Sequence, residues 1–593
     1  MVGVYTGGPW DERGLMAAAS FGIARWRLIA LGLLLAAATI GIVLRLAQLQ
    51  LFDYTEYRTE AQSSHEGQLA VQAQRGTIRD RNGFPLAVSV PVYQVALHPR
   101  AWATSEAADR VRQIVAARLS VPLERLEAAT APGRWVVVQP NVPYNIGRGL
   151  GALALPGVET TLVSMRTYPE GNLAAPLLGF VGADQEGLSG LEADFQRELA
   201  GMAGALAFER DGFGQPIPIG DHKLLRLYEA GQDLVLTLDR YLQRLVERTL
   251  DEAMTKHKAS GGTIIMMDPR TGEVLAMASR PTYDLTKLDL VSTAPQQVAQ
   301  YRNRAITDLY EPGSVFKIIT MASAIDGGIV TPSTTYYDGG PIVRYGWTIN
   351  TWNGGHYGTQ TMTDILRTSN NIGAVWVAER AGADRFYRYV RAFGFGQPTG
   401  IGLSGEASGR IRASGEDDWK PIDLATNSFG QGLSVTPIQM AAAISAVANG
   451  GTLLRPTIVK ELRGAQGSRA FQPVLVRRPL TEKGAALLQE MLNVTAEKGG
   501  SPLAMVPGYH IAGKTGTADL PAVGGYNRST TIASYGGFAP YPVPRLVVVV
   551  KIDEPKDQIY GSLVAAPIFS SLMRQALPYL GIPPSEPVRI AKQ

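Results

Sequence analysis

Residues 311–325 read EPGSVFKIITMASAI, and the rest of the sequence can be interpreted outward from this stretch. Pro312 and Gly313 stand where a helix would begin, and the apolar run after Lys317 continues that helix. The spacing predicts that Ser314 lies in the first helical turn, on the same face as Lys317. A serine hydroxyl needs an adjacent base to act as a nucleophile. A lysine can be that base if burial and nearby positive charge lower its pKa.

Two further short motifs follow in order along the chain. Ser369-Asn370-Asn371 lies in a polar break between two helical stretches, and Lys514-Thr515-Gly516-Thr517 follows a run of apolar and turn residues. Gly516 would let a substrate backbone approach a strand edge closely, and Lys514 would supply a fixed charge for a carboxylate. Each motif alone is typical of a helix cap or a turn, as is a serine followed by a solvated lysine. The joint occurrence of all three favours a catalytic serine.

The composition excludes several other classes of protein. The chain has 593 residues, of which 45% are hydrophobic and 18% are charged, so it has enough apolar material for folded domains. The net charge of +4 and the absence of long like-charged blocks do not predict nucleic-acid binding. The absence of cysteine excludes a thiol nucleophile, a disulfide scaffold and cysteine-ligated zinc. The six histidines are scattered, so the sequence predicts neither a metal site nor a cofactor.

One apolar stretch near the N-terminus predicts a membrane anchor. Residues 28–44 carry no charge, and the apolar run continues past them to about the 20 residues that a bilayer span needs. Arg13, Arg25 and Arg27 precede the stretch, so the positive-inside rule predicts a cytoplasmic N-terminus and an extracytoplasmic bulk. We expect a single-pass protein of the cytoplasmic (inner) membrane. A cleaved signal peptide is the alternative, because Ala36–Ala38 are small residues after an apolar core.

The rest of the chain divides into two outer modules. Residues 72–99 alternate apolar and polar side chains around an Arg-Asn-Gly turn and predict a strand hairpin, and residues 100–126 have helical spacing. A strand and an amphipathic helix at 231–256 begin the second module, which continues with paired strands at 261–279 and a buried strand at 546–553. This mixture indicates an α/β or α+β fold. The predicted bounds are a tail at 1–26, the anchor at 27–49, the modules at 50–230 and 231–582, and a tail at 583–593.

The sequence resembles the class B penicillin-binding proteins, most closely those of the division-type FtsI family. The three motifs carry the resemblance, together with the stretches RGTIRDRNGFPLAVSV (75–90), RTYPEGNLAAPLLGFVG (166–182), GLSGLE (187–192) and FGQGLSVTPIQM (429–440). It covers nearly the whole chain after the anchor. It implies an elongated, mainly-β or α+β pedestal at 50–230 and a penicillin-binding transpeptidase domain at 231–582, with a central antiparallel sheet flanked by helices. Asn370 stands where relatives often have aspartate.

The resemblance also implies a role for each motif residue. Ser314 would be the acyl-accepting nucleophile and Lys317 its general base. Ser369 would relay a proton to the leaving D-alanine amine, and Asn371 would bind the substrate amide and help to position Lys317.

The third motif would bind the end of the substrate. Lys514 would keep the pocket positive, while the hydroxyls of Thr515 and Thr517 would bind the terminal carboxylate, with Gly516 between them. The backbone N–H groups of Ser314 and Thr517 would form the oxyanion hole. The implied reaction cross-links peptidoglycan stem peptides with release of D-alanine, and a D-Ala-D-Ala carboxypeptidase side activity is compatible with it. β-Lactams would leave a stable acyl-enzyme.

A structural or partner-facing role, and not a catalytic one, is expected for the motif residues of the pedestal, which are Arg75, Gly76, Asp80, Arg81, Asn82, Gly83 and Glu192. We expect Arg75, Asp80, Arg81 and Glu192 to lie in a buried network of arginine and carboxylate groups.

The resemblance implies partners and leaves alternative functions open. No glycan-polymerising module precedes the pedestal, so a polytopic polymerase of the FtsW/RodA type and other divisome or elongasome membrane proteins are the expected partners. The role in cell division competes with an elongation role that has the same chemistry. A non-catalytic penicillin sensor or scaffold is a further hypothesis, disfavoured because all three motifs are intact. A β-lactamase is disfavoured because no deacylating glutamate is recognisable.

Overall fold

The computed structural model describes residues 25–53, 55, 66–71, 73–131, 133–209, 222–288, 299–499, 501–522 and 525–585. Of the two predicted tails, residues 1–24 and 586–593 lie outside the described residues. The chain separates into two compact units, one formed by residues 1–71 and 204–227 and the other by residues 72–203 and 228–593. Each unit is described by itself.

The first unit contains an apolar helix and a small sheet. Helix α1 (Arg25–Ala47) continues into the π-helical turn η1 (Gln48–Phe52). Residues 26–52 are long and apolar enough to cross a membrane, and this helix is the one such candidate among the residues that the structure describes. The sheet is antiparallel, in the order β1 (Glu66–Val71), β6 (Gly204–Glu209), β7 (His222–Arg226). The predicted anchor therefore corresponds to a helix of suitable length and composition.

A seven-stranded sheet joins the two predicted modules within the second unit. Strands β2 and β3 form the predicted hairpin, and β8 lies between β2 and β16. The sheet order is β17-β16-β8-β2-β3-β4, and β5 also pairs with β3. The strands are β2 (Ile78–Arg79), β3 (Pro85–Leu97), β4 (Val136–Pro143), β5 (Val158–Thr167), β8 (Asp233–Leu236), β16 (Val459–Gly464) and β17 (Gly467–Ala470). Because strands from both modules share this sheet, the boundary near residue 230 stays a prediction.

Helices pack on this sheet where the sequence has helical spacing. The side chain of Thr104 accepts a hydrogen bond from Ala107 N and caps α3, and Ser120 ends that helix in a left-handed conformation. Val111 and Val115 of α3 pack with Val95 of β3 in one buried cluster. The helices of this region are α3 (Ser105–Leu119), α4 (Leu123–Thr130), α5 (Tyr144–Gly151), α6 (Ala175–Leu178), α7 (Gly190–Asp194) and α8 (Gln196–Ala200), with the 3₁₀ turn η2 (Pro99–Ala101).

A buried ion network holds the first module together. Glu192 on α7 is fully buried and accepts hydrogen bonds from Nε of Arg75 and from Nε of Arg166, each at 2.7 Å. The two guanidinium groups are themselves buried and also bond to backbone carbonyl groups. The predicted buried arginine–carboxylate network is confirmed for Arg75 and Glu192, and Arg166 is a further member. The prediction is wrong for Asp80, which is buried but accepts hydrogen bonds from backbone N–H groups, and for Arg81, which forms a partly exposed ion pair with Glu273. The network ties the chain before β2 to β5 and α7.

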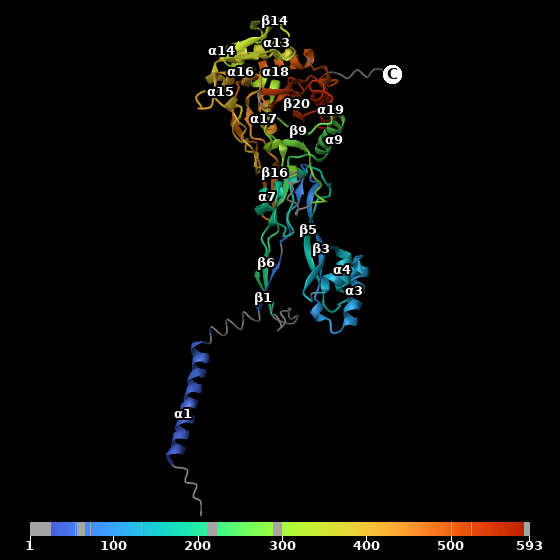
Figure 1. Ribbon diagram of the computed structural model, residues 1–593, viewed down its shortest axis with the longest axis vertical. Coiled ribbons are helices and arrows are strands. Elements are labelled where there is room, and N and C mark those ends of the chain that lie inside the picture. Colours follow the sequence, from blue (N-terminus) through green and yellow to red (C-terminus); the bar gives the residue numbers. More distant parts are fainter. Residues whose placement is uncertain are drawn as a thin grey trace, which may run out of the picture. The chain divides into compact units, whose positions relative to one another are not determined.

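A five-stranded antiparallel sheet forms the centre of the second module (Figure 1). Its order is β10-β9-β21-β20-β19, so β19 is an edge strand. Strands β9 and β10 are buried at every position, and β21 at all but its last, because helices cover both faces of the sheet. The strands are β9 (Gly261–Met267), β10 (Val274–Arg280), β19 (Ala512–Ala522), β20 (Gly525–Ala539) and β21 (Leu546–Asp553).

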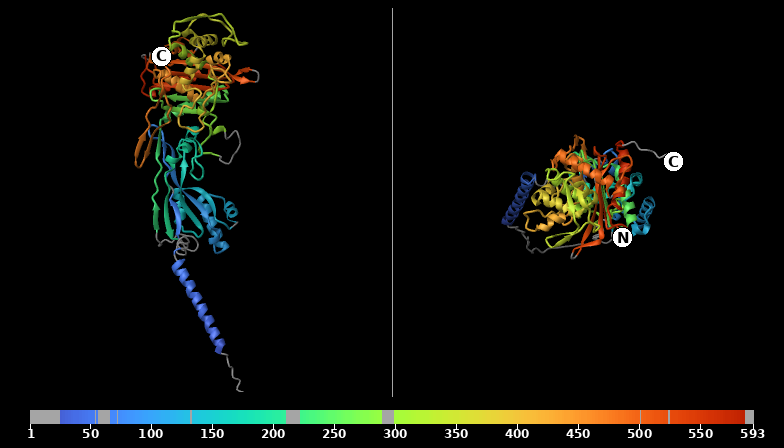
Figure 2. Two further views of the ribbon diagram at one scale, coloured as in Figure 1. Left: turned by 90° about the vertical axis from the view of Figure 1, so that its left-hand side faces the viewer. Right: turned by 90° about the horizontal axis from the view of Figure 1, so that it is seen from above.

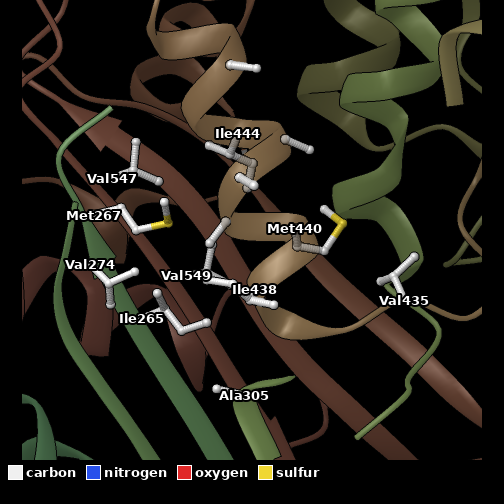
Figure 3. Packing of buried hydrophobic residues seen from close by; sticks show 14 of the residues in the cluster. Ile265, Met267, Val274, Ala305, Val435, Ile438, Met440, Ile444, Val547 and Val549 are labelled. Atoms are coloured by element: carbon white, nitrogen blue, oxygen red, sulfur yellow. The ribbon is translucent and has the colours of Figure 1, made fainter. Parts of the chain in front are cut away.

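Helices cover the two faces of this sheet with separate hydrophobic clusters. Helices α9 (Arg240–His257) and α19 (Ala565–Tyr579) contribute to one cluster, and α17 (Pro437–Ala448) contributes to the other. Figure 3 shows Ile444 of α17 beside the sheet residue Val547, and Ile438 beside Val549. Each such side chain, fully buried, stabilises the fold by roughly 1.5–3 kcal/mol. The predicted antiparallel sheet flanked by helices is confirmed.

The remaining elements surround the sheet. They are α11 (Arg304–Thr307), η3 (Gly313–Phe316), α12 (Lys317–Ile325), β11 (Thr335–Asp338), β12 (Ile342–Arg344), β13 (Trp347–Ile349), β14 (Gly358–Thr361), α13 (Met362–Thr368), α14 (Asn371–Ala381), α15 (Ala383–Ala392), α16 (Pro421–Ser428), β15 (Leu453–Leu454), β18 (Leu475–Arg477), α18 (Glu482–Lys498) and η4 (Pro502–Ala504).

Candidate active site

Ser314 and Lys317 lie side by side at the start of a buried helix. Gly313, with φ +55°, opens the 3₁₀ turn η3, and α12 begins at Lys317. Lys317 Nζ lies 2.8 Å from Ser314 Oγ, so the predicted placement of both side chains on one face is confirmed. The turn is fixed from outside by a hydrogen bond of 3.0 Å from Gly313 N to Gly430 O. A serine hydroxyl and an amine are thus held at contact distance before any substrate arrives.

The surroundings of Lys317 favour a neutral amine. Its side chain is 1% exposed, and Nζ contacts Ser369 O at 2.7 Å, Ser369 Oγ at 3.2 Å and Asn371 Oδ1 at 2.8 Å. All these partners are uncharged. Burial, and then the nearby charge of Lys514, lower the pKa of Lys317 well below its usual value. A lysine in this setting can accept a proton near neutral pH.

The second motif lies at the junction of two helices, as predicted. Helix α13 ends at Thr368, its C-cap residue Ser369 adopts a left-handed conformation with φ +57°, and α14 begins at Asn371. This conformation is uncommon for residues other than glycine, asparagine and aspartate, and here it turns the serine toward Lys317. Asn371 donates from Nδ2 to the carbonyl of Asn350 at 3.0 Å, which leaves its Oδ1 facing Lys317.

Asn370, between these two residues, serves the fold. It is fully buried, and its Oδ1 accepts a hydrogen bond from Gly373 N, which caps α14. Its Nδ2 donates to Asp338 Oδ2 at 2.8 Å and to Gln360 Oε1 at 2.7 Å. The oxygens of Asp338 and Gln360 are acceptors, so residue 370 must offer them a donor, which the amide nitrogen of Asn370 supplies.

Lys514 reaches the same site from the edge strand β19. Its side chain is 2% exposed, and Nζ donates to Ser369 Oγ at 3.0 Å and to Thr515 O at 3.1 Å. Burial lowers the pKa of Lys514 to about 7. The charge expected to be fixed therefore varies with pH around neutrality in the free protein. A bound carboxylate would favour the charged form.

The other residues of the third motif lie along β19 beside the turn η3. The Oγ1 of Thr517 accepts a hydrogen bond from Gly561 N at 3.0 Å. At Gly516, a Cβ atom would lie 2.8 Å from Val315 Cγ2 and 2.9 Å from Pro312 O, and closer still to Ser534 Oγ on β20. The glycine is thus required by the packing of β19 against η3 and against the Ser534 side chain, which is a different reason from the substrate approach inferred from the sequence. Contacts of Thr515, Gly516 and Thr517 with substrate stay predictions.

A carboxylate that sequence reasoning missed supports this arrangement. Glu311 Oε1 accepts hydrogen bonds from Gly432 N at 3.0 Å and from the hydroxyl of Tyr526 on β20 at 3.2 Å. Its Oε2 is buried and has no hydrogen-bond partner among the described residues. Burial raises the pKa of Glu311 to about 7. The sequence feature that could have indicated this residue is the position of Glu311, three residues before Ser314.

The fold and these side chains define a class of protein in which a partly exposed serine contacts a buried lysine beside the edge strand of an antiparallel sheet. Two family profiles match the chain, the penicillin binding protein transpeptidase domain at residues 262–574 and the penicillin-binding protein dimerisation domain at residues 70–236. The chain belongs to the penicillin-binding protein transpeptidase family, as a class B member.

Individual relatives agree with this family. Stage V sporulation protein D of Bacillus subtilis is 35% identical over 88% of this chain and 81% of its own length. Peptidoglycan D,D-transpeptidase FtsI of Escherichia coli is 33% identical over 87% of this chain and 85% of its own length. The crystal structure of penicillin binding protein 3 from Mycobacterium tuberculosis, complexed with aztreonam, is similar with a TM-score of 0.68 and 26% identity, over 88% of this chain and 100% of that chain.

Proposed function

We propose that the protein is a peptidoglycan D,D-transpeptidase that cross-links stem peptides through an acyl-enzyme on Ser314. The observation that carries the proposal is the 2.8 Å separation between Lys317 Nζ and Ser314 Oγ in a site where the lysine is almost wholly buried. Because burial lowers the pKa of Lys317, a neutral amine is available to take the hydroxyl proton. The similarity to peptidoglycan D,D-transpeptidase FtsI supports the same activity.

In the acylation step, Ser314 Oγ attacks the carbonyl carbon of the penultimate D-alanine in a donor stem peptide. The hydroxyl proton moves to Lys317 as the new C–O bond forms. Ser369 Oγ lies within 3.2 Å of both lysine nitrogens, so it can relay that proton to the departing amine as the C–N bond breaks. An amine from a neighbouring strand then attacks the ester carbonyl carbon and forms the cross-linking C–N bond. The C–O bond to Ser314 breaks, and the proton lost by the attacking amine passes to Ser314 Oγ.

The third motif would hold the terminal carboxylate of the donor. The hydroxyl oxygen of Thr517 accepts a hydrogen bond from Gly561, so its own proton is free for a carboxylate oxygen. Thr515 would donate a second hydrogen bond, and charged Lys514 would favour the anion. The N–H groups of Ser314 and Thr517 would stabilise the developing oxyanion. A β-lactam would enter the same site and leave a stable acyl-enzyme.

The activity can be tested with full-length protein in detergent micelles. We would measure D-alanine release and cross-linked dimers from a glycan polymer that carries D-Ala-D-Ala stem peptides. Ser314→Ala should abolish both products, while Ser404→Ala, at an exposed serine, should change neither. Undiminished D-alanine release by Ser314→Ala would contradict the proposal.

We propose further that this activity serves septal cell-wall synthesis, with a glycan polymerase of the FtsW/RodA type as membrane partner. The similarity to FtsI over 87% of the chain supports this role. Depletion of the protein in its own organism would then give filamentous cells that lose the septal pool of the polymerase. Round, swollen cells would instead support the elongation role, and an unchanged shape would contradict both.

The same proposal places the N-terminus in the cytoplasm and the transpeptidase domain outside. The chain has no cysteine, so single cysteines can report its topology. A membrane-impermeant maleimide should label Ala470→Cys, at an exposed position of β17, in intact spheroplasts. Thr6→Cys should react only after the membrane is opened. The reverse pattern would contradict the proposed orientation.

A further inference from the structure

A short hairpin beside the active site exposes an unusual amount of apolar surface. Strands β12 and β13 pair in register, with Arg344 opposite Trp347, and a two-residue turn joins them. This segment is the yellow-green arch at the top of the left-hand view in Figure 2. Val343, Tyr345 and Trp347 are 62%, 65% and 64% exposed. Side chains of this size at such exposure call for a partner.

The turn of this hairpin places a tyrosine in a backbone conformation that disfavours it. Tyr345 and Gly346 have φ +51° and φ +84°, the values of a type I′ turn, in which asparagine followed by glycine is strongly preferred. A bulky aromatic residue in the left-handed region is strained. The ring of Tyr345 is exposed, and its backbone conformation lowers the stability of the turn. We therefore infer that this ring has a function other than folding.

The hairpin contacts helix α14 at both of its ends, through Ile349 at its base and through Arg344 beside its turn. Ile349 is buried in a cluster with Ala374 and Val375 of helix α14. The guanidinium of Arg344 forms an ion pair with Glu379 of the same helix, with Nε 2.5 Å from Oε1. The exposed rings are therefore presented by a fixed support, and binding would cost little additional conformational entropy.

The hairpin is continuous with the active site. Directly after β13, the carbonyl of Asn350 accepts the hydrogen bond from Asn371 of the second motif. Trp352 donates from Nε1 to the carbonyl of Thr368, the residue before Ser369. Its ring also meets Tyr560 at 5.7 Å between centroids, next to Gly561, which bonds to Thr517. A chain lying along the hairpin would therefore pass directly to the reacting groups.

The chemistry of the segment selects the kind of partner. Residues 342–357, IVRYGWTINTWNGGHY, contain one residue of fixed charge, Arg344, and Glu379 neutralises it. The other side chains are aromatic, aliphatic, hydroxyl, amide or imidazole groups. Rings with polar edges suit a neutral polymer whose sugar rings offer an apolar face and many hydroxyl and amide groups. The one fixed charge of the segment is paired within the protein, so the segment does not favour an acidic or a basic partner.

We propose that the hairpin of residues 342–352 binds the glycan of a peptidoglycan strand, with sugar rings stacked on Tyr345 and Trp347. The stem peptide attached to that glycan is thereby delivered to Ser314. The inference rests on the proposed function, because that function supplies a substrate joined to a glycan. It adds a binding surface outside the catalytic groups.

The test separates glycan binding from acylation. Full-length protein in detergent micelles is sedimented with chitin, an uncharged polymer of N-acetylated sugar rings that carries no stem peptides. Tyr345→Asn combined with Trp347→Ala should weaken this binding by about tenfold, a loss of the size expected for two aromatic contacts. Tyr345→Asn alone should weaken binding while raising the melting temperature slightly, because asparagine suits the turn. A merely structural tyrosine would not show this opposite response.

Two controls distinguish a loss of glycan binding at the hairpin from a general loss of binding or of acylation. Trp135→Ala removes a ring of 53% exposure in the pedestal and should leave glycan binding unchanged. The rate of labelling by a small fluorescent penicillin should be unchanged in the hairpin variants, because that ligand carries no glycan. Wild-type glycan binding by the double variant would overturn the inference, as would equal losses in Trp135→Ala. Failure of the wild type to react with penicillin would instead count against the proposed function.

Discussion

Lys514 Nζ donates a hydrogen bond of 3.0 Å to Ser369 Oγ, which joins the edge strand β19 to the turn between α13 and α14. The same oxygen lies 3.2 Å from Lys317 Nζ. One hydroxyl thus contacts both lysine nitrogens, and the path of a proton between them passes through Ser369.

Replacing Ser369 by alanine should interrupt this path. We expect Ser369→Ala to lower the second-order rate of acylation by roughly 10²–10⁴-fold, the usual contribution of a positioned proton-transfer group. The variant should keep its melting temperature within a few degrees, because Asn370, and not Ser369, caps α14. Stopped-flow fluorescence with a labelled penicillin measures the rate. A rate within threefold of wild type would show that the proton takes another route.

Gly516→Ala should impair the site by moving β19. The new methyl group would collide with Val315 and with the carbonyl of Pro312, so the strand must shift away from the turn η3. We expect a loss of about 1–3 kcal/mol in stability from overpacking, and a larger loss in acylation because Thr517 moves with the strand. Gly149→Ala, in helix α5 with open space around it, is the matched control. It should leave acylation unchanged and raise stability by up to about 1 kcal/mol, because alanine favours a helix over glycine. Unaltered acylation by Gly516→Ala would refute this account of the glycine.

The pKa of Glu311 predicts a pH dependence of stability. Burial raises that pKa from 4.5 to about 7, so the folded state binds the proton more tightly than the unfolded chain. Stability should therefore fall as pH rises from about 5 through 7, by on the order of 2 kcal/mol. Glu311→Gln keeps an acceptor for Gly432 and Tyr526 and cannot ionise. Its melting temperature relative to wild type should rise between pH 5 and pH 8, and a constant difference would contradict the prediction.

The buried network of the pedestal predicts a strong effect of a small change. Glu192→Gln leaves Arg75 and Arg166 buried without a counter-charge, which should destabilise the fold by about 3–5 kcal/mol. Asp109→Asn removes one partner of the exposed pair with Arg112 and should cost less than about 1 kcal/mol. Thermal unfolding and limited proteolysis compare the two variants. Equal stability of the two would contradict the structural role of Glu192.

Much of the site could be predicted because its residues form short motifs with a local geometry. Helical spacing was enough to place Ser314 beside Lys317, and the polar break at residues 369–371 was enough to expect a helix junction. The alternation around residues 81–83 likewise predicted the hairpin of β2 and β3, which the structure confirms.

Other features depend on contacts between distant segments and could not be predicted in this way. The depth at which Lys514 is buried sets its pKa near 7, and no pattern around that residue reports burial. The bond from Tyr526 to Glu311 joins residues 215 positions apart. The packing of Gly516 against Pro312 gave the glycine a different role from the one its motif suggested.

The most direct test of the central claim is to find which atom a β-lactam acylates. Full-length protein is treated with a fluorescent penicillin, digested and analysed by peptide-level mass spectrometry, beside Ser314→Ala and Lys317→Ala. The account predicts a stable adduct on Ser314 that Ser314→Ala abolishes and that Lys317→Ala abolishes or greatly slows. An adduct on another serine, or no adduct on the folded wild-type protein, would contradict it.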